Sequence, residues 1–236
     1  MRSKDYFIIN GEQSSNDFGL YVDTPPMQAM AEQHTSEIKI ADREESLFIT
    51  YNSYNDITLN ITAYSFENSF NISAVYAWLR TAKTLKFNAQ ADRYYKVKKL
   101  MGIVPNYSGN GKNIITISMI VSPFKYFTND APVTSTAKQF NVENAGNIYC
   151  RPVYTIAGSG DITIGTVDAQ GGELEKLTIY GVNGGCTVDV ERLMVTKDKV
   201  SLKSAGMLPI LQAGTNKIVV TGAVTSVSVK RNQRDV

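Results

Sequence analysis

The sequence predicts a mainly β protein with one α-helix, divided into two domains. Thr, Ser, Asn, Ile and Val are frequent, and these residues favour strands and the turns between them. Several segments alternate apolar and polar residues with a period of two, which is typical of half-buried strands. Gly, Asn and Pro recur between those segments, where they end strands and reverse the chain.

Four short strands are expected before residue 52. Each ends at a turn, a charged run or a proline pair, and together they comprise Tyr6–Asn10, Phe18–Val22, Glu37–Ala41 and Leu47–Tyr51. The last two are joined by the charged run Asp42-Arg43-Glu44-Glu45. This arrangement predicts a hairpin with a solvated tip, and the tip has no obvious core to cover in its own domain.

The segment Ile57–Tyr64 gives the clearest strand of the first half. Ile57, Leu59 and Ile61 fall on one face, while polar residues alternate with them on the other face. Further strands are expected at Thr84–Phe87, Tyr94–Val104 and Ile115–Val121.

One segment changes to helical spacing. Ile72, Val75, Tyr76 and Leu79 recur at intervals of three and four residues, which predicts one apolar face of a helix. Asn71 precedes them and can cap the first turn. We expect this to be the single helix of the chain.

The stretch Asn129–Lys138 is rich in Ser, Thr and Pro and predicts a linker. It divides the chain into expected domains at 1–130 and 131–236. The second half shows short strands at regular spacing and no helical stripe, which predicts a β-sandwich of about 100 residues. Its expected strands are Gln139–Val142, Val153–Ile156, Asp161–Val167, Leu174–Tyr180, Cys186–Val190, Arg192–Thr196, Lys199–Leu202, Lys217–Thr221 and Val224–Val229.

Charge and cysteine content exclude several classes of protein. The formal net charge is +2, from 24 basic and 22 acidic residues, so phosphate neutralisation is not expected to hold nucleic acid. The two cysteines, Cys150 and Cys186, are expected to be buried free thiols, although pairing stays open if the fold brings them together. Neither a signal peptide nor a membrane span is apparent, so we expect synthesis and folding in a cytoplasm.

No pattern in the sequence indicates an enzyme. His34 is the only histidine, and no nucleophile elbow or Cys-His signature accompanies it. Ser108-Gly109-Asn110-Gly111-Lys112 lacks the spacing of a phosphate-binding loop and predicts a hairpin turn instead. We expect no catalytic residues, no metal site and no cofactor.

The order of features resembles the distal tail protein (Dit) family of long-tailed bacteriophages. The resemblance spans nearly the whole chain, and no single motif is specific. The segments that carry it are Ile9-Asn10-Gly11, Asp17-Phe18-Gly19-Leu20, Ala77-Trp78-Leu79, Leu85-Lys86-Phe87, Tyr94-Tyr95, Ser122-Pro123-Phe124-Lys125-Tyr126, Asn144-Ala145-Gly146-Asn147, Arg151-Pro152, Ile156-Ala157-Gly158-Ser159-Gly160-Asp161, Leu208-Pro209, Gly214-Thr215-Asn216 and Thr221-Gly222.

The resemblance implies an N-terminal ring-forming domain and a C-terminal galectin-like β-sandwich. It implies a ring of six copies at the virion tail tip, with the first domain lining a channel for DNA. It also implies contacts with the tail-tube protein, a tail-associated hub protein and often receptor-binding proteins, and no membrane insertion.

Two sets of residues are expected to serve such a ring. The hairpin is the candidate arm that reaches a neighbouring subunit, and its interface residues are Glu37, Lys39, Asp42, Arg43, Glu44, Glu45 and Phe48. One face of the basic and aromatic strand after Arg93 is the candidate channel lining, with Tyr94, Lys96 and Lys98.

The alternative function is a carbohydrate-binding adhesin that recognises host cell-wall sugars through the second domain. That domain has no Trp and no His, so only its tyrosines could stack on a sugar ring: Tyr149, Tyr154 and Tyr180. A third hypothesis, a tail-associated hydrolase, lacks a catalytic constellation.

Overall fold

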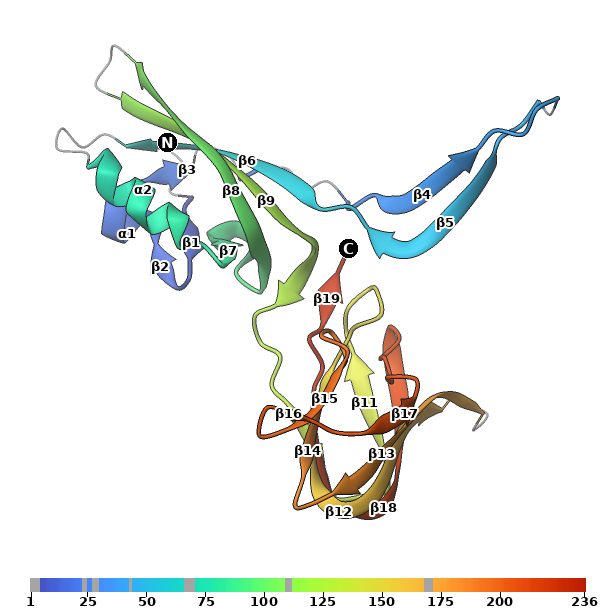
Figure 1. The fold of residues 1–236 in the computed structure, drawn as a ribbon. Helices are drawn as coiled ribbons and strands as arrows, with labels where there is room; N and C mark the ends of the chain where they lie inside the picture. Colours follow the sequence, from blue (N-terminus) through green and yellow to red (C-terminus); the bar gives the residue numbers. More distant parts are fainter. Residues whose placement is uncertain are drawn as a thin grey trace. The chain divides into compact units, whose positions relative to one another are not determined.

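The computed structural model describes residues 5–22, 25–26, 30–42, 44–65, 71–108, 112–167 and 172–236. The chain forms two compact units, Met1–Thr128 and Asn129–Asp235. Both are built mainly from antiparallel strands (Figure 1). The predicted fold class, mainly β, is therefore confirmed.

The N-terminal unit contains one large antiparallel sheet with the strand order β2-β1-β7-β8-β9-β6-β3. Its strands are β1 (Phe7–Ile9), β2 (Glu12–Gln13), β3 (Tyr21–Val22), β6 (Ile57–Ser65), β7 (Thr84–Phe87), β8 (Arg93–Ser108) and β9 (Lys112–Phe127). The short 3₁₀ helix η1 (Asn88–Gln90) joins β7 to β8. A separate pair, β4 (Gln33–Ile38) and β5 (Leu47–Tyr54), forms a two-stranded sheet of its own.

The alternating pattern of β6 predicted one buried face and one exposed face, and the structure confirms both. Leu59, Ile61 and Ala63 are buried, while the residues between them up to Thr62 are exposed. β6 pairs with β9 without a register shift, so Ile61 lies opposite Ile117 and both enter the same core. The predicted turn at Gly109-Asn110-Gly111 between β8 and β9 lies outside the described residues.

Helix α2 (Ile72–Arg80) lies where the sequence predicts it. The Asn71 side chain accepts a hydrogen bond from the backbone N–H of Ala74 at 3.1 Å, which caps the first turn. Val75, Trp78 and Leu79 are buried from one side of the helix, and Phe18 stacks on the Trp78 ring with 4.2 Å between ring centroids.

The expectation of a single helix is corrected by α1 (Ser14–Phe18), where residue Phe18 ends a helix rather than beginning a strand. Five residues are too few to show a 3.6-residue apolar period, so the pattern gave no signal. Tertiary contacts hold this turn: the Ser14 hydroxyl donates to the Leu20 carbonyl and accepts from the Phe7 N–H. Gly19 ends the helix in the left-handed conformation, with φ of 61°.

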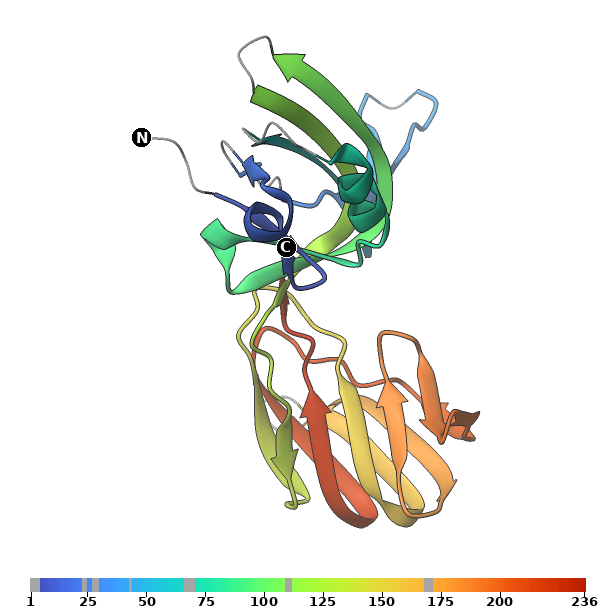
Figure 2. The ribbon, with the colours of Figure 1, turned by 90° about the vertical axis from the view of Figure 1, so that its left-hand side faces the viewer.

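The C-terminal unit has two layers joined by two long strands, β12 (Val153–Val167) and β18 (Gly214–Lys230). One layer follows the order β10-β18-β12-β14-β15-β16. In the other layer, β11 pairs with the first half of β18, and β13 pairs with the second half of β12. β17 pairs with the free side of β13. The other strands of these layers are β10 (Val133–Ser135), β11 (Gln139–Asn144), β13 (Glu173–Val182), β14 (Cys186–Asp189), β15 (Met194–Lys197), β16 (Val200–Ser201) and β17 (Ser204–Gly206). The short strand β19 (Arg234–Asp235) follows β18 and belongs to neither layer. Figure 2 shows the strands of this unit running side by side, with β18 in red.

The two long strands pass from one layer to the other at shifts in their register. These shifts lie between Ala157 and Gly158 and between Ser159 and Thr163. On β18 the change of layer occurs near Gly222, whose φ of 101° disfavours any side chain. A Cβ atom at Gly222 would also collide with the carbonyl oxygen of Asp161. Glycine is therefore needed where the strands bend.

The core between the layers is aliphatic and closed. Ile156, Ile164, Ile179 and Val188 are fully buried or nearly so. Cys150 and Cys186 are buried free thiols, as predicted. The predicted linker Asn129–Lys138 is corrected in part, because Val133–Ser135 form β10 and pair with β18.

Candidate assembly surface

The hairpin of β4 and β5, called the arm below, is the most exposed apolar element that the structure describes. Its strands pair antiparallel, with Ile38 opposite Leu47, Glu37 opposite Phe48 and Ser36 opposite Ile49. Within the described part of the chain, β4 and β5 pair with each other and with no other strand. Figure 1 shows the arm as a long two-stranded ribbon.

One side of the arm carries an uncovered apolar surface, called the arm patch. It consists of large side chains whose exposed fractions lie between 39% and 47%: Ile38, Leu47, Ile49 and Tyr51. Ile40, just beyond the end of β4, is 45% exposed as well. In a half-buried strand such an apolar row would be covered by a core. Exposed apolar groups that lie together mark interaction sites more often than they mark random surface.

The predicted interface residues lie on the arm or at its tip, but they are mostly the charged ones. Glu37, Lys39, Asp42, Glu44 and Glu45 are exposed, and Arg43 lies outside the described residues. Their role in an interface remains a prediction.

The sequence did not predict the arm patch. Phe48 is the one apolar residue among the predicted interface residues, and it is 63% exposed on the opposite side of the arm, beside Glu37. The alternation Leu47, Ile49, Tyr51 was visible in the sequence. Alternation predicts which residues share a face, but not whether that face is covered.

The arm is also longer than predicted. Its strands span Gln33–Ile38 and Leu47–Tyr54, whereas the sequence predicted Glu37–Ala41 and Leu47–Tyr51. The sole histidine lies here, with its ring 5.1 Å from that of Tyr51. His34 therefore packs on an aromatic ring of the arm, and nothing about this contact indicates catalysis.

The predicted channel-lining residues make local contacts in β8 and its neighbours. Tyr94 stacks on Tyr126 with 5.7 Å between ring centroids, and the Lys96 ammonium lies 4.0 Å from the centre of the same Tyr126 ring. Lys98 forms an ion pair with Asp56, with 2.6 Å between nitrogen and oxygen. Asp56 therefore offsets part of the positive charge that this strand would offer to DNA, and the role in a channel remains a prediction.

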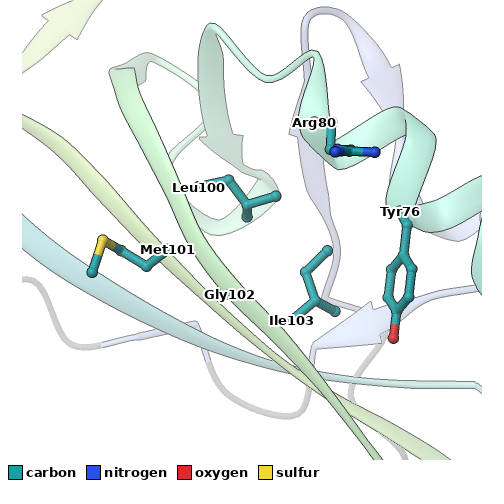
Figure 3. A pocket seen from close by; sticks show the side chains of 6 residues that line it. All are labelled: Tyr76, Arg80, Leu100, Met101, Gly102 and Ile103. Carbon is teal, nitrogen blue, oxygen red and sulfur yellow. The ribbon is translucent and has the colours of Figure 1, made fainter.

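A hollow of about 250 Å³ lies between α2 and β8. Tyr76 and Arg80 line it from the helix, and the segment Leu100–Ile103 lines it from the strand (Figure 3). Leu100 and Ile103 extend toward the helix, whereas Met101 lies on the other side of the strand. A Cβ atom placed on Gly102 would meet nothing within 4 Å, so the space beside this glycine is open.

A second surface of interest is a row of hydroxyl residues across one layer of the C-terminal unit. Strand pairing places one hydroxyl residue of each strand in register, in the order Thr134, Ser228, Thr155, Thr187, Thr196 and Ser201. Four of them, Thr155, Thr187, Thr196 and Ser228, line a surface hollow of about 460 Å³. The row spans residues far apart in the chain, so no local sequence signal could have shown it.

The tyrosines considered for sugar stacking lie in different environments. Tyr154 is fully buried, and its hydroxyl donates to the Pro209 carbonyl at 3.0 Å, so it does not offer a ring to a ligand. Tyr180 is partly exposed beside Lys203, and Tyr149 lies beside the Arg234 guanidinium.

Buried ionisable groups in this unit have pKa values shifted by burial. Burial raises the pKa of the Cys150 thiol to about 12 and raises that of Cys186. Burial also raises the pKa of Glu175. The hydrogen bond that its carboxylate accepts from the Ile210 N–H acts in the opposite direction and lowers this pKa, but burial has the larger effect. Protonated thiols are poor nucleophiles, so these cysteines are suited to packing rather than to chemistry.

Among the residues that the structure describes, no three His, Cys, Asp or Glu side chains gather as a metal site. No described helix is long and apolar enough to cross a membrane.

Comparison with known proteins gives a match by structure and none by sequence. No family model matches the chain, and no curated protein matches it. The crystal structure of the SPP1 Dit (gp 19.1) protein, described as a hub adsorption apparatus in phages that infect Gram-positive bacteria, aligns with a TM-score of 0.72 at 13% identity. The alignment covers 99% of this chain and 100% of that one.

The chain has the fold of a phage Dit protein. Two structures of the phage P2 baseplate, in its activated conformation with calcium and with strontium, align with lower TM-scores of 0.49 and 0.48 at 10% identity. They cover 96% and 97% of this chain and 98% of each matched chain. The family resemblance noted in the sequence is thus confirmed at the level of the fold by the SPP1 protein.

Proposed function

We propose that this Dit-like chain is a non-enzymatic structural protein of a bacteriophage tail tip. Six copies assemble into a ring that joins the tail tube to the adhesion apparatus and leaves a central channel for DNA. Its partners are further copies of itself, the tail-tube protein, a hub protein and receptor-binding proteins. The fold shared with the SPP1 Dit protein over the whole chain supports this role.

The observation that carries the proposal is the arm patch. A closed ring needs a surface on each subunit that fits a different surface on the next one. The arm supplies one such surface, because its apolar side chains are exposed and its strands pair only with each other in the described chain. Covering these side chains with a neighbouring copy removes apolar area from water and so stabilises the assembly.

The test is the mass of the full chain in solution, measured by light scattering behind a sizing column at several concentrations. We expect a species of about six times 26.0 kDa. The double variant Leu47→Ser/Ile49→Ser should shift the mass toward one copy, because it makes the arm patch polar. At a concentration where both proteins have the mass of one copy, its melting temperature should stay close to that of the unmodified protein, since both side chains are already exposed.

A matched control makes the same chemical change elsewhere. Leu193→Ser/Val200→Ser alters two exposed apolar residues of the C-terminal unit and should leave the mass unchanged. A single-copy mass for the unmodified protein at every concentration, with or without added tail-tube protein, would contradict ring assembly.

The hydroxyl row favours a second candidate function, binding of cell-wall carbohydrate by the C-terminal unit. Hydroxyl side chains both donate and accept hydrogen bonds, as sugar hydroxyls do, and the row crosses a hollow rather than a flat surface. A glycan array probed with the full chain tests it. Binding that disappears in Thr155→Val/Thr187→Val would support this candidate, and no binding to any glycan would remove it.

A further inference from the structure

One edge of β8 is unpaired in the described chain where it borders the hollow between α2 and β8, called the α2 hollow below. β7 pairs with β8 only at Lys96 and Tyr95, while β9 pairs with β8 along its opposite side as far as Ser108. From Leu100 to Asn106, no strand in the described ranges occupies the side of β8 away from β9. An unpaired strand edge presents free N–H and C=O groups and readily accepts a further strand.

We propose that this edge of β8, together with the α2 hollow, receives β5 of the arm of a neighbouring copy. The inference rests on the proposed ring and deepens it by naming the surface that the arm contacts. The outer edge of β5 is unpaired in the described chain, and β5 has 8 residues. Since strands advance about 3.3 Å per residue, β5 matches the length of the open segment Leu100–Asn106.

The two faces of β5 match the two faces of the β8 edge. If β5 continues the sheet, Leu47 and Ile49 lie on one face and can cover the hollow lined by Leu100 and Ile103. The opposite face then brings Phe48 toward Met101 and Val104, which are 54% and 63% exposed. Leu47, Phe48 and Ile49 would thereby each meet an apolar group of the neighbour.

The charges that flank the two segments are opposite in sign. Directly before the open edge, β8 carries Lys98, which pairs with Asp56, and Lys99, and the whole strand has no acidic residue. The arm from Glu37 to Leu47 carries four acidic residues and two basic ones. Arg80 adds a further positive charge at the hollow. Complementary charges of this kind favour the correct encounter between copies and fix its register.

Cross-linking between copies tests the contact directly. One full-length chain carries Phe48→Cys, a second carries Met101→Cys, and the mixture is treated with a short bis-maleimide. The native Cys150 and Cys186 are buried, so the unmodified protein serves as the blank. We expect a cross-linked dimer in the mixture of the two variants.

The matched control replaces the arm cysteine with one at another exposed apolar site. Leu193→Cys mixed with Met101→Cys should give no dimer above the blank, because Leu193 is an exposed residue of the C-terminal unit, and the proposed contact involves only residues of the N-terminal unit. Equal cross-linking by this pair would show that the reaction is not specific and would overturn the docking site.

A second variant tests the same contact by placing a side chain in the space beside Gly102 that the neighbour's arm would occupy. Gly102→Val adds a side chain where no atom lies within 4 Å of the added Cβ, so the isolated chain should keep its melting temperature. Assembly should weaken by about tenfold in dissociation constant, which corresponds to about 1.4 kcal/mol.

The outcomes separate this inference from the proposed ring. If the protein has the mass of six copies, but neither the cross-link nor the effect of Gly102→Val is seen, the docking site is wrong and the ring proposal stands. If the unmodified protein has the mass of one copy at every concentration, the ring proposal and the docking site both fail.

Discussion

The arm and the C-terminal unit use the same local pattern and bury it differently. Both are antiparallel strands in which apolar side chains alternate with polar ones. In the C-terminal unit, Ile164 and Val188 are fully buried because a second layer covers them. In the arm, Leu47 and Ile49 remain exposed by more than a third of their surface. The comparison teaches that one strand pattern forms a core where a second layer covers it and leaves apolar side chains exposed where the described chain offers no such layer. We propose that the exposed case serves assembly.

The largest expected effect breaks the core side of this comparison. Ile164→Ala should lower the free energy of unfolding of the C-terminal unit by about 2–5 kcal/mol, because it removes buried methyl groups and leaves a cavity. Ile49→Ala, the same change on the arm, should alter the free energy of unfolding by no more than about 0.5 kcal/mol. Urea unfolding at a concentration where the chain has the mass of one copy measures both. Equal losses would show that the arm patch is covered within its own chain.

An intermediate effect sharpens the comparison for polar groups. Asp130 accepts hydrogen bonds from Arg231 at 3.0 Å and from the backbone and side chain of Gln233, and it is largely buried. On the arm, Glu37 accepts a hydrogen bond from the Ser46 hydroxyl in an exposed position.

Asp130→Ala should therefore cost about 1.5–3 kcal/mol, the usual value of hydrogen bonds to charged groups. Glu37→Ala should cost no more than about 0.5 kcal/mol. Thermal unfolding of the two variants at one pH compares them. A loss for Glu37→Ala as large as that for Asp130→Ala would mean that the arm is buried in the isolated chain.

The smallest expected effect concerns pH. Burial raises the pKa of Glu175, so the folded state binds a proton more tightly than the unfolded state does. Stability therefore falls as the pH rises above the usual glutamate pKa, where the unfolded carboxyl ionises first. Glu175→Gln should remove this fall, because an amide does not ionise in this pH range. Its amide oxygen can still accept the hydrogen bond from the Ile210 N–H, so the local structure is kept.

Unfolding curves measured from pH 4 to pH 7 test this expectation, with Glu44→Gln at the exposed arm tip as the matched control. The difference between the protein and Glu175→Gln should grow with pH in favour of the variant. A difference that stays constant across this range would show that burial does not perturb Glu175.

Local chemistry explains what could be predicted of the fold. The two-residue alternation of Ile57–Tyr64 specified β6 and its buried face, because successive side chains of a strand point to opposite sides. Asn71 and the helical spacing after it specified α2, because capping and amphipathic periodicity act within a few residues. The one-turn helix α1 was missed because its stability comes from Ser14, Phe7 and Leu20 contacts rather than from its own sequence.

The sequence by itself determined the strand-rich class, the helix α2, the burial expected of the two cysteines and the presence of a hairpin around the charged run Asp42-Arg43-Glu44-Glu45. Tertiary structure alone decided which apolar faces are covered, since burial depends on elements that meet across long sequence separations. The hydroxyl row shows this, because it aligns residues from Thr134 to Ser228 only through strand pairing. The open edge of β8 shows it too, because β7 is only four residues long and, among the described strands, no other strand pairs with that side of β8.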